Sequence, residues 1–265
     1  MCLANIHSIS SYLKYYLTSQ TKYKIHSPFV YDLVTNVLEN NEPEISFDQI
    51  QKLYKELSIS SRVLETTDFG GSQNNRTYQT KFLPISNIAK NASIFNNSGK
   101  LLFRLVQHFK PLKILELGTS LGISTLYLAK AAPNATITTI EGCAAKVEIA
   151  RANFTKMNIT NVEVRTGRFD TQLPLILDQI EHPDFVFIDG HHQLRPTVDY
   201  FQRIIKHSLE TTVFVIDDIH WSTGMEKAWK VIQQLPEVTV TIDLYRLGLV
   251  FLNKSLSKQD FILRF

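Results

Sequence analysis

Apolar and polar residues follow one another in a pattern that predicts five strand–helix units after residue 112. Each unit starts with a short run rich in apolar or β-branched residues and continues into a segment of helical period, as parallel strands and their covering helices do. The predicted strands are 114–117, 137–140, 162–165, 185–188 and 213–216, and the helix after the third strand is predicted from Pro174 to Ile180. Two last apolar runs, 238–244 and 247–252, are separated by a short turn and predict an antiparallel hairpin at one edge of the sheet. Together these elements predict a doubly wound α/β fold with a seven-stranded, mostly parallel sheet.

The first hundred residues show mainly helical periodicity. The predicted helices are 6–17, 28–39, 47–57, 84–95 and 99–109, and Ser27 before Pro28 is a typical helix start. The stretch 66–75 is polar and rich in glycine, so its part from Asp68 to Asn75 is expected either to close over a ligand crevice as a lid or to serve as a plain connector. We therefore predict an N-terminal helical extension over 1–98 and a ligand-binding domain over 99–265.

Charge and composition narrow the classes of partner. The 265 residues carry a formal net charge of +3 and no long basic run, which favours neither nucleic acid nor a membrane surface as a partner, without excluding either. Cys2 and Cys143 lie far apart and fit no metal or disulfide framework, as expected in a reducing cytoplasm. The start of the chain lacks a secretory apolar core, and no stretch reaches the roughly 18 apolar residues of a membrane span. These features predict a cytoplasmic protein.

The turn after the first predicted strand has the most informative chemistry. It reads Glu116-x-Gly118-x-x-x-Gly122, whereas a dinucleotide fingerprint would read G-x-G-x-x-G. Glycines allow the backbone to approach a ligand closely, and the helix that follows points unpaired N–H groups at the same crevice. An acid at the strand end disfavours a diphosphate and suits an amine-bearing or cationic ligand. The candidate cofactor-binding residues here are Glu116, Gly118, Thr119, Ser120, Gly122 and Ser124.

Acids and histidines also follow the other strands. Glu141, with Gly142 beside it, comes about twenty residues after Gly122, where a carboxylate can accept hydrogen bonds from both ribose hydroxyls of a nucleoside.

The fourth and fifth strands end in three carboxylates that predict an oxygen-rich site for a hard divalent cation such as Mg²⁺. These candidate metal ligands are Asp189, Asp217 and Asp218. His192 has an ordinary pKa near ~6.5 and suits removal of a proton from a hydroxyl, and His220 is its rival. For each histidine, a structural hydrogen bond to a carboxylate is an equal alternative.

From about Lys100 to Leu252 this ordered set of motifs resembles class I S-adenosylmethionine-dependent methyltransferases, which are Rossmann-like. The resemblance implies that the Glu116–Gly122 turn holds the methionine part of the cofactor, and that Gly167, Arg168 and Phe169 lie where the family binds adenine. The ends of strands four and five look like the small-molecule O-methyltransferases of the catechol and caffeoyl-coenzyme A type. Those enzymes place an Asp-Asn pair where this chain has Asp217 and Asp218.

Position 192 departs from the catechol enzymes, which have a lysine base there. The run Ile188-Asp-Gly-His-His192 resembles more closely a broader bacterial methyltransferase family with an Ile-Asp-Gly-x-His signature. The candidate catalytic residues are thus His192, Asp189 and His220, and Asp189 is also a candidate for cofactor binding.

We therefore expect a methyltransferase that uses S-adenosylmethionine, with Mg²⁺ as an additional candidate cofactor, and that acts on a hydroxyl of a small-molecule acceptor. A homodimer is left open. Three alternatives remain: a non-catalytic S-adenosylmethionine-binding subunit that holds a partner, a nucleotide-dependent oxidoreductase, and a methyltransferase of RNA or protein.

Overall fold

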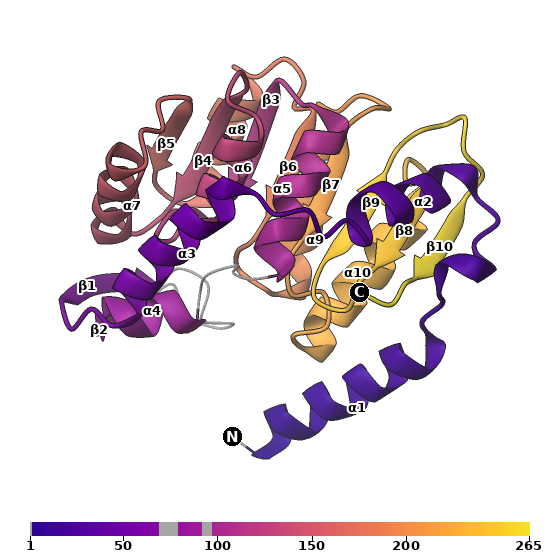
Figure 1. Cartoon of the computed structure of the whole chain (residues 1–265), viewed down its shortest axis with the longest axis horizontal. Coiled ribbons are helices and arrows are strands. Elements are labelled where there is room, and N and C mark those ends of the chain that lie inside the picture. The colour runs from indigo at the N-terminus through magenta and orange to yellow at the C-terminus, as the bar shows by residue number, and fades with distance from the viewer. Residues whose placement is uncertain (1, 69–78, 92–96) are drawn as a thin grey trace. The chain divides into compact units, whose positions relative to one another are not determined.

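The computed structural model describes residues 2–68, 79–91 and 97–265 (Figure 1). The chain forms two compact units, which are described one at a time. The central unit is Asn41–Ile180, and the terminal unit combines Met1–Asn40 with Glu181–Phe265. The boundary expected between residues 98 and 99 is a different division, and it stays a prediction.

The central unit contains three parallel strands in the order β3-β4-β5: β3 (Lys113–Leu117), β4 (Thr136–Glu141) and β5 (Val162–Thr166). The first three predicted strands are therefore confirmed. β3 and β4 are almost wholly buried, as their continuous apolar runs require. The helices of this unit that accompany the strands are α5 (Asn97–Phe109), α6 (Ile123–Ala131), α7 (Ala144–Lys156) and α8 (Phe169–Leu177).

Two helices and a hairpin precede these strands in the central unit. α3 (Ile45–Ser58) and α4 (Ile85–Asn91) pack together, and β1 (Val63–Asp68) pairs with β2 (Gln79–Pro84) in antiparallel fashion. The Phe47 ring of α3 meets the Phe103 ring of α5 edge-on at 5.0 Å, within one apolar cluster. The described apolar residues of α3, β1 and α4 are thus part of the core of the central unit.

This hairpin corrects the expected loop and helix around it. Thr66 to Asp68 belong to β1, and the Thr66 hydroxyl donates to the Lys81 carbonyl at 2.9 Å. The chain up to Pro84 is strand β2, so the helix expected from residue 84 begins at Ile85. Pairing with a distant strand outweighed the local turn signal. The remainder of the expected lid, residues 69–78, lies outside the described residues.

The helix expected from Pro174 starts five residues earlier, at Phe169. The amide of Gln172 donates to the Arg168 carbonyl at 2.9 Å and closes the first turn there. Pro174 was interpreted as the first helical residue, but it lies inside α8. Gly167 and Arg168 therefore precede the helix, and Phe169 is its first residue.

The terminal unit contains five strands in the order β10-β8-β9-β7-β6. β6 (Phe185–Ile188) and β7 (Val213–Ile216) are parallel, and the expected hairpin of β8 (Val240–Asp243) and β9 (Gly248–Phe251) is antiparallel. β9 also pairs antiparallel with β7, opposite Ile216 at Gly248. One strand, β10 (Gln259–Ile262), lies beyond the seven that were predicted and pairs parallel with β8. α9 (Leu194–Ile205) and α10 (Thr223–Gln234) pack against each other.

The first helices of the chain pack with its last residues. These helices are α1 (Cys2–Thr18), η1 (Lys22–Lys24), α2 (Pro28–Leu33) and η2 (Val34–Leu38). The Tyr15 hydroxyl donates to the Leu263 carbonyl at 2.5 Å, and the Phe29 and Phe251 rings meet edge-on at 4.9 Å. The helix start expected at Ser27 is confirmed, since its side chain accepts from the Val30 amide. The N-terminal helices therefore complete the core of the terminal unit.

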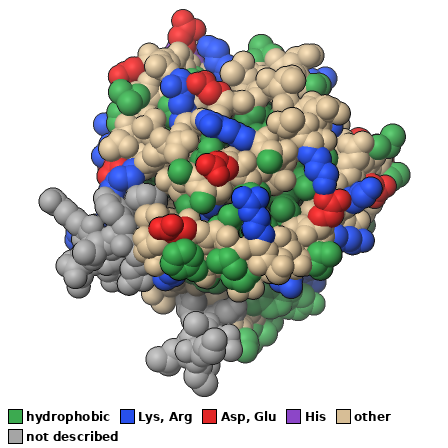
Figure 2. Space-filling model, turned by 90° about the vertical axis from the view of Figure 1, so that its left-hand side faces the viewer, with side chains coloured by type: hydrophobic (Ala, Val, Ile, Leu, Met, Phe, Trp, Pro, Cys, Tyr) green, Lys and Arg blue, Asp and Glu red, His purple; other side chains and the backbone are tan. Residues whose placement is uncertain are grey.

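The charged surface agrees with the modest net charge. On the face drawn in Figure 2, the described basic and acidic side chains are interspersed, and no continuous basic area forms among them. Among the described residues, every helix is too short or too polar to cross a bilayer.

Candidate functional site

The glycine turn of the central unit begins where β3 ends. Gly118 and Gly122 both have positive φ, 110° and 84°, and Ser120 between them has φ 47°. The amides of Gly118 and Thr119 donate to the Ile140 carbonyl at 3.0 and 3.2 Å, which ties the turn to β4. A Cβ on Gly122 would lie 2.6 Å from the Phe154 ring of α7. Only glycine fits this position without strain, and α6 then begins directly at Ile123.

Glu116 occupies a different position from the one its sequence context suggested. Its side chain is fully buried, whereas an acid facing the ligand was expected. Its carboxylate accepts hydrogen bonds from the hydroxyls of Ser124 at 2.7 Å, Thr125 at 2.5 Å and Thr139 at 2.6 Å. Charge-assisted bonds of this kind are the strong ones, so Glu116 ties β3, α6 and β4 together beneath the turn. Ser124, another candidate cofactor residue, is likewise engaged inside the protein.

Two other turn residues differ in how their hydroxyls are satisfied. The Thr119 hydroxyl is 2.6 Å from that of Thr139 and buried. The Ser120 hydroxyl oxygen is also buried, but it has no hydrogen-bond partner within the described part of the chain. Buried polar atoms are normally paired. An orphaned hydroxyl in the middle of the turn therefore fits a ligand that contributes a polar group there.

Glu141 joins the ends of two loops. One carboxylate oxygen accepts from the Ser120 amide at 2.9 Å, and the other accepts from the Cys143 amide at 2.9 Å. Gly142 lies between Glu141 and Cys143 and is half-buried. Each carboxylate oxygen has a second acceptor position that can bind a ligand hydroxyl. This is the geometry expected of a ribose-binding acid on the second strand.

The candidate adenine-binding residues follow β5 and are joined to the end of β4 in the central unit. Gly167 has φ 149°, and its amide donates to the Glu141 carbonyl at 2.9 Å. Arg168 forms a two-bond ion pair with Asp170, at 2.8 and 2.5 Å. Phe169 is half-buried at the first position of α8. A flat apolar ring beside a neutralised charge pair is compatible with stacking on a base.

In the terminal unit, Asp189 and His192 follow β6. His192 Nε2 lies 3.4 Å from Asp189 Oδ1, and His191 and His192 both have positive φ, 63° and 36°. Such values are uncommon for residues with a Cβ and mark strained or functional segments. Burial lowers the pKa of His192, but the carboxylates of Asp189, Asp218 and Asp217 together raise it to about 9. The imidazole is thus held in its protonated form at neutral pH.

Asp217 and Asp218 follow β7. Asp217 is 1% exposed, and burial together with Asp189 and Asp218 raises its pKa to about 7, against the lowering effect of Arg246. The Arg246 guanidinium donates to both carboxylate oxygens of Asp217, through Nε at 3.1 Å and Nη2 at 3.2 Å. It is also 3.6 Å from Asp218 Oδ1. These four residues, Asp189, Asp217, Asp218 and Arg246, are called the acid cluster below.

Arg246 was missed by sequence analysis, although a signal for it existed. It lies in the turn of the predicted C-terminal hairpin, and that hairpin is joined to the end of β7 through the pair of Ile216 and Gly248. The sequence placed the hairpin at one edge of the sheet but did not indicate which strand it pairs with. Pairing it with the fifth strand would have placed its turn beside the acids.

His220 is engaged on both sides of its ring. Nε2 lies 2.7 Å from Asp243 Oδ2, while Nδ1 lies 3.2 Å from Glu226 Oε1 and 3.2 Å from the Ser11 hydroxyl of α1. The Tyr245 ring stacks on it at 5.2 Å. Both ring nitrogens therefore have protein partners, which favours the structural alternative for His220 over proton transfer.

The acid cluster does not fit Mg²⁺ as the sequence had suggested. Mg²⁺ needs oxygen ligands at about 2.0–2.1 Å in octahedral geometry. Both oxygens of Asp217 are occupied by a guanidinium, whose charge would repel a cation. Within residues 2–68, 79–91 and 97–265, no group of three His, Cys, Asp or Glu side chains has the arrangement of a metal site.

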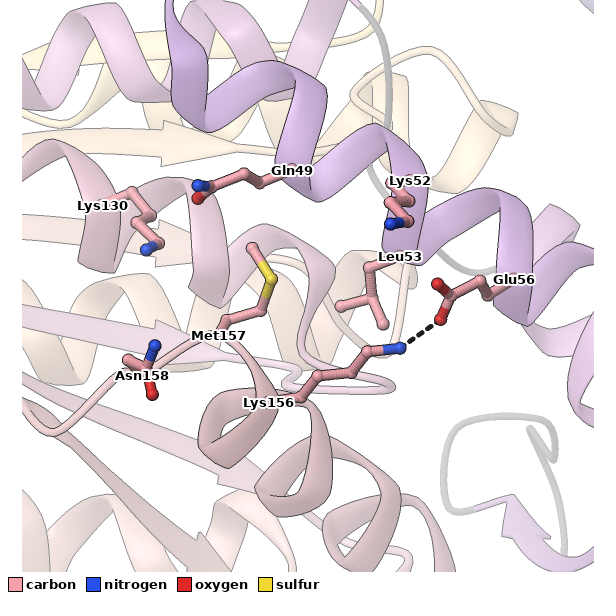
Figure 3. Close-up of a pocket in the computed structure, with 8 residues that line it drawn as sticks. All are labelled: Gln49, Lys52, Leu53, Glu56, Lys130, Lys156, Met157 and Asn158. Atoms are coloured by element: carbon pink, nitrogen blue, oxygen red, sulfur yellow. Dashed lines mark hydrogen bonds and ion pairs between the residues drawn. The ribbon is translucent and has the colours of Figure 1, made fainter.

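A further cavity of about 270 Å³ lies in the central unit (Figure 3). Its lining includes Lys52 of α3, Lys130 in the last turn of α6 and Lys156 at the end of α7, which is paired with Glu56. The cavity therefore adjoins the C-terminal ends of α6 and α7, whereas the glycine turn adjoins the start of α6. It is separate from the candidate cofactor residues.

Part of the chain is similar in sequence to known methyltransferases. Residues 115–219 match the family model of a methyltransferase domain. A catechol O-methyltransferase of Niastella koreensis is 34% identical over 130 residues, which are 48% of this chain and 58% of that protein. A catechol O-methyltransferase of Mycobacterium tuberculosis is 32% identical over 123 residues, which are 46% of this chain and 54% of that protein. The chain therefore spans little more than half the length of these curated relatives.

Solved structures share the fold over most of the chain. The O-methyltransferase from Bacillus cereus in complex with SAH aligns with a TM-score of 0.57 and 21% identity, over 84% of this chain and 97% of the other. The O-methyltransferase TomG from Streptomyces achromogenes in complex with SAM aligns with a TM-score of 0.57 and 20% identity, over 84% and 94%. The fold is thus Rossmann-like. The expected resemblance to methyltransferases is confirmed by the family model, and the resemblance to the O-methyltransferase type by the catechol O-methyltransferase relatives.

Proposed function

We propose that this chain is an S-adenosylmethionine-dependent methyltransferase that methylates a hydroxyl oxygen of a small molecule. One observation supports it most: Glu141 is held by the Ser120 and Cys143 amides at the glycine turn, inside the segment that matches a methyltransferase domain. The carboxylate is aligned before any ligand arrives, so a nucleoside can bind without reorganising it.

The cofactor contacts follow from the central unit. We propose that Glu141 accepts hydrogen bonds from the ribose hydroxyls, and that the backbone from Gly118 to Gly122 receives the methionine part. The unpaired Ser120 hydroxyl is a further contact, and Phe169 packs on the adenine. Glu116 and Ser124 act indirectly in this proposal, because their mutual hydrogen bond keeps the turn in shape.

The acceptor chemistry is assigned to the terminal unit. In the reaction, the acceptor oxygen forms a bond to the methyl carbon, the carbon–sulfur bond breaks with its electron pair going to sulfur, and the hydroxyl proton of the acceptor leaves to solvent water. The sulfonium is already a good leaving group, so positioning supplies much of the acceleration. We propose that His192 faces the acceptor. Its protonated ring, paired with Asp189, stabilises a developing oxyanion at neutral pH, and it accepts a proton only in its neutral form.

A homodimer and a cytoplasmic location stay predictions. Mg²⁺ is not part of the proposal, because Arg246 occupies the oxygens of Asp217 that would bind it.

Two titrations test the proposal and its rivals. Calorimetry of the full chain with S-adenosylhomocysteine and, separately, with NAD distinguishes the methyltransferase from the oxidoreductase. Binding of S-adenosylhomocysteine without NAD is expected, and binding of NAD alone would refute the proposal. Incubation with methyl-labelled S-adenosylmethionine and a panel of catechols, phenols and sugars should then yield a labelled product. Tight cofactor binding with no labelled product from any acceptor would favour the non-catalytic subunit.

A further inference from the structure

One member of the acid cluster, Arg246, is positively charged. Asp217 is almost wholly buried, and a buried carboxylate is costly unless an opposite charge and hydrogen bonds compensate it. Arg246 supplies both, because Nε and Nη2 donate to the two oxygens of Asp217 in the parallel arrangement that arginine makes with carboxylates. The same guanidinium lies 3.6 Å from Asp218. One cation therefore serves two acids at the end of β7.

The backbone holds Arg246 in this position. Its carbonyl accepts from the Ile219 amide at 3.2 Å, and its amide donates to the Leu244 carbonyl at 2.9 Å. The preceding residue, Tyr245, has φ 68° and donates its amide to Asp243 Oδ1 at 2.8 Å. The turn between β8 and β9 is thus fixed to the loop that follows β7. The ion pair is part of this built turn, because the backbone on both sides of Arg246 is hydrogen-bonded.

We infer that Arg246 is the cation of the acid cluster and stands in place of a divalent metal. Both oxygens of Asp217 are already used, and a fixed positive charge next to them opposes a second cation. The charges of the cluster agree with this assignment. Asp189, Asp217 and Asp218 supply three carboxylates, and Arg246 lies 3.1 Å from Asp217 and 3.6 Å from Asp218. The assignment of Arg246 does not depend on the reaction that the chain catalyses. Its consequence for catalysis rests on the proposed function: methyl transfer by this chain does not need Mg²⁺.

Binding of Mn²⁺, a paramagnetic substitute for Mg²⁺, tests the assignment without an acceptor. Free and bound Mn²⁺ are distinguished by electron paramagnetic resonance on the full chain and on two variants. Arg246→Met removes the guanidinium, and Arg203→Met is the matched control, because Arg203 is 42% exposed against 43% for Arg246 and also pairs with an aspartate, Asp199, at 2.9 Å. Both substitutions remove one positive charge.

We expect Arg246→Met to bind Mn²⁺ at least about tenfold more tightly than the wild type and Arg203→Met, which should bind alike. Adding Asp217→Asn to Arg246→Met should abolish the gain. The inference is overturned if Arg246→Met gains no affinity. It is equally overturned if the wild type binds Mn²⁺ at a site that Asp217→Asn removes, and this second outcome decides the matter even where Arg246→Met fails to fold.

A parallel titration of the same samples with S-adenosylhomocysteine separates this inference from the proposed function. If the wild type does not bind S-adenosylhomocysteine, the proposed function is refuted, while the Mn²⁺ series still tests the role of Arg246. If an acceptor is found, turnover should be unchanged by a chelator, and turnover that stops with chelator and returns with Mg²⁺ would overturn the inference alone.

Discussion

Replacing Gly122 by alanine tests the glycine turn most directly. Gly122 has φ 84°, in the left-handed region, where a residue with a Cβ costs roughly 1–2 kcal/mol. The added Cβ would lie 2.6 Å from Phe154 Cε1, 2.8 Å from its Cζ and 3.3 Å from Ala150 Cβ. Over-packing of this kind costs typically about 1–3 kcal/mol. The two effects together predict that Gly122→Ala lowers the free energy of unfolding by roughly 2–5 kcal/mol.

The matched control is Gly224→Ala in α10. A Cβ there would lie 3.5 Å from the Ser222 hydroxyl and 3.8 Å from the Leu194 amide nitrogen, which are ordinary contacts. Because alanine is the better helix former, this variant should be as stable as the wild type or up to about 1 kcal/mol more stable.

Urea unfolding followed by far-ultraviolet circular dichroism measures both variants. Tryptophan fluorescence adds a second probe, because the two tryptophans, Trp221 and Trp229, lie in the terminal unit and Gly122 lies in the central unit. Gly122→Ala should also weaken S-adenosylhomocysteine binding at least about tenfold, since the Ser120 amide is displaced from Glu141. Equal unfolding midpoints and equal affinities for Gly122→Ala and Gly224→Ala would refute the reasoning.

Three further predictions concern single side chains. Glu116→Gln keeps the shape of the side chain but replaces one acceptor oxygen by an NH₂ group, so at least one of the Ser124, Thr125 and Thr139 hydroxyls loses its acceptor. We expect urea unfolding to show a destabilisation of about 1–3 kcal/mol. An unchanged unfolding midpoint would contradict the role of Glu116 beneath the turn. Glu141→Ala should lower S-adenosylhomocysteine affinity at least about tenfold by calorimetry, whereas Glu148→Ala, at an exposed position of α7, should leave it unchanged. Equal affinities would remove Glu141 from the cofactor site. The pKa of His192 is raised from 6.5 to about 9, so the folded state prefers the protonated ring, and this contribution to stability is complete below pH 6.5 and is lost as the pH rises to about 9. Histidine NMR titration should show one ring with this midpoint, absent in His192→Gln, and a His192 resonance titrating near 6.5 would contradict the pairing with Asp189.

Much of the fold was predictable because its signals are local. The apolar runs of β3, β4, β6 and β7, the glycines after β3, and the Ser27 helix start each depend on residues within a few positions of one another. The positions of Glu141, Asp189 and Asp217 at strand ends follow from the same patterns, since an acid directly after a buried strand lies at its carboxyl end. The order of these motifs was enough to predict the methyltransferase resemblance that the family model confirms.

Local signals misled where a distant partner decided the structure. The Thr66–Asp68 segment looked like a loop, but pairing with Gln79–Thr80 and Lys81 makes it a strand. β10 has only four residues and forms because β8 offers it a parallel edge. Glu116 was expected to face a ligand, and the hydroxyls of α6 and β4 bury it instead. In each case the missing information was the neighbour across a strand or a turn.

The acid cluster shows the division between sequence and tertiary structure. From the sequence alone, Asp189, Asp217 and Asp218 predict a hard divalent cation such as Mg²⁺, because carboxylate oxygens are its usual ligands. The positive charge beside Asp217 is instead that of Arg246, 29 residues along the chain, and its position depends on the antiparallel register that sets Gly248 opposite Ile216. Hydrophobic periodicity does not determine such a register. It indicates the face of the sheet on which a side chain lies, but not which strand lies next to it.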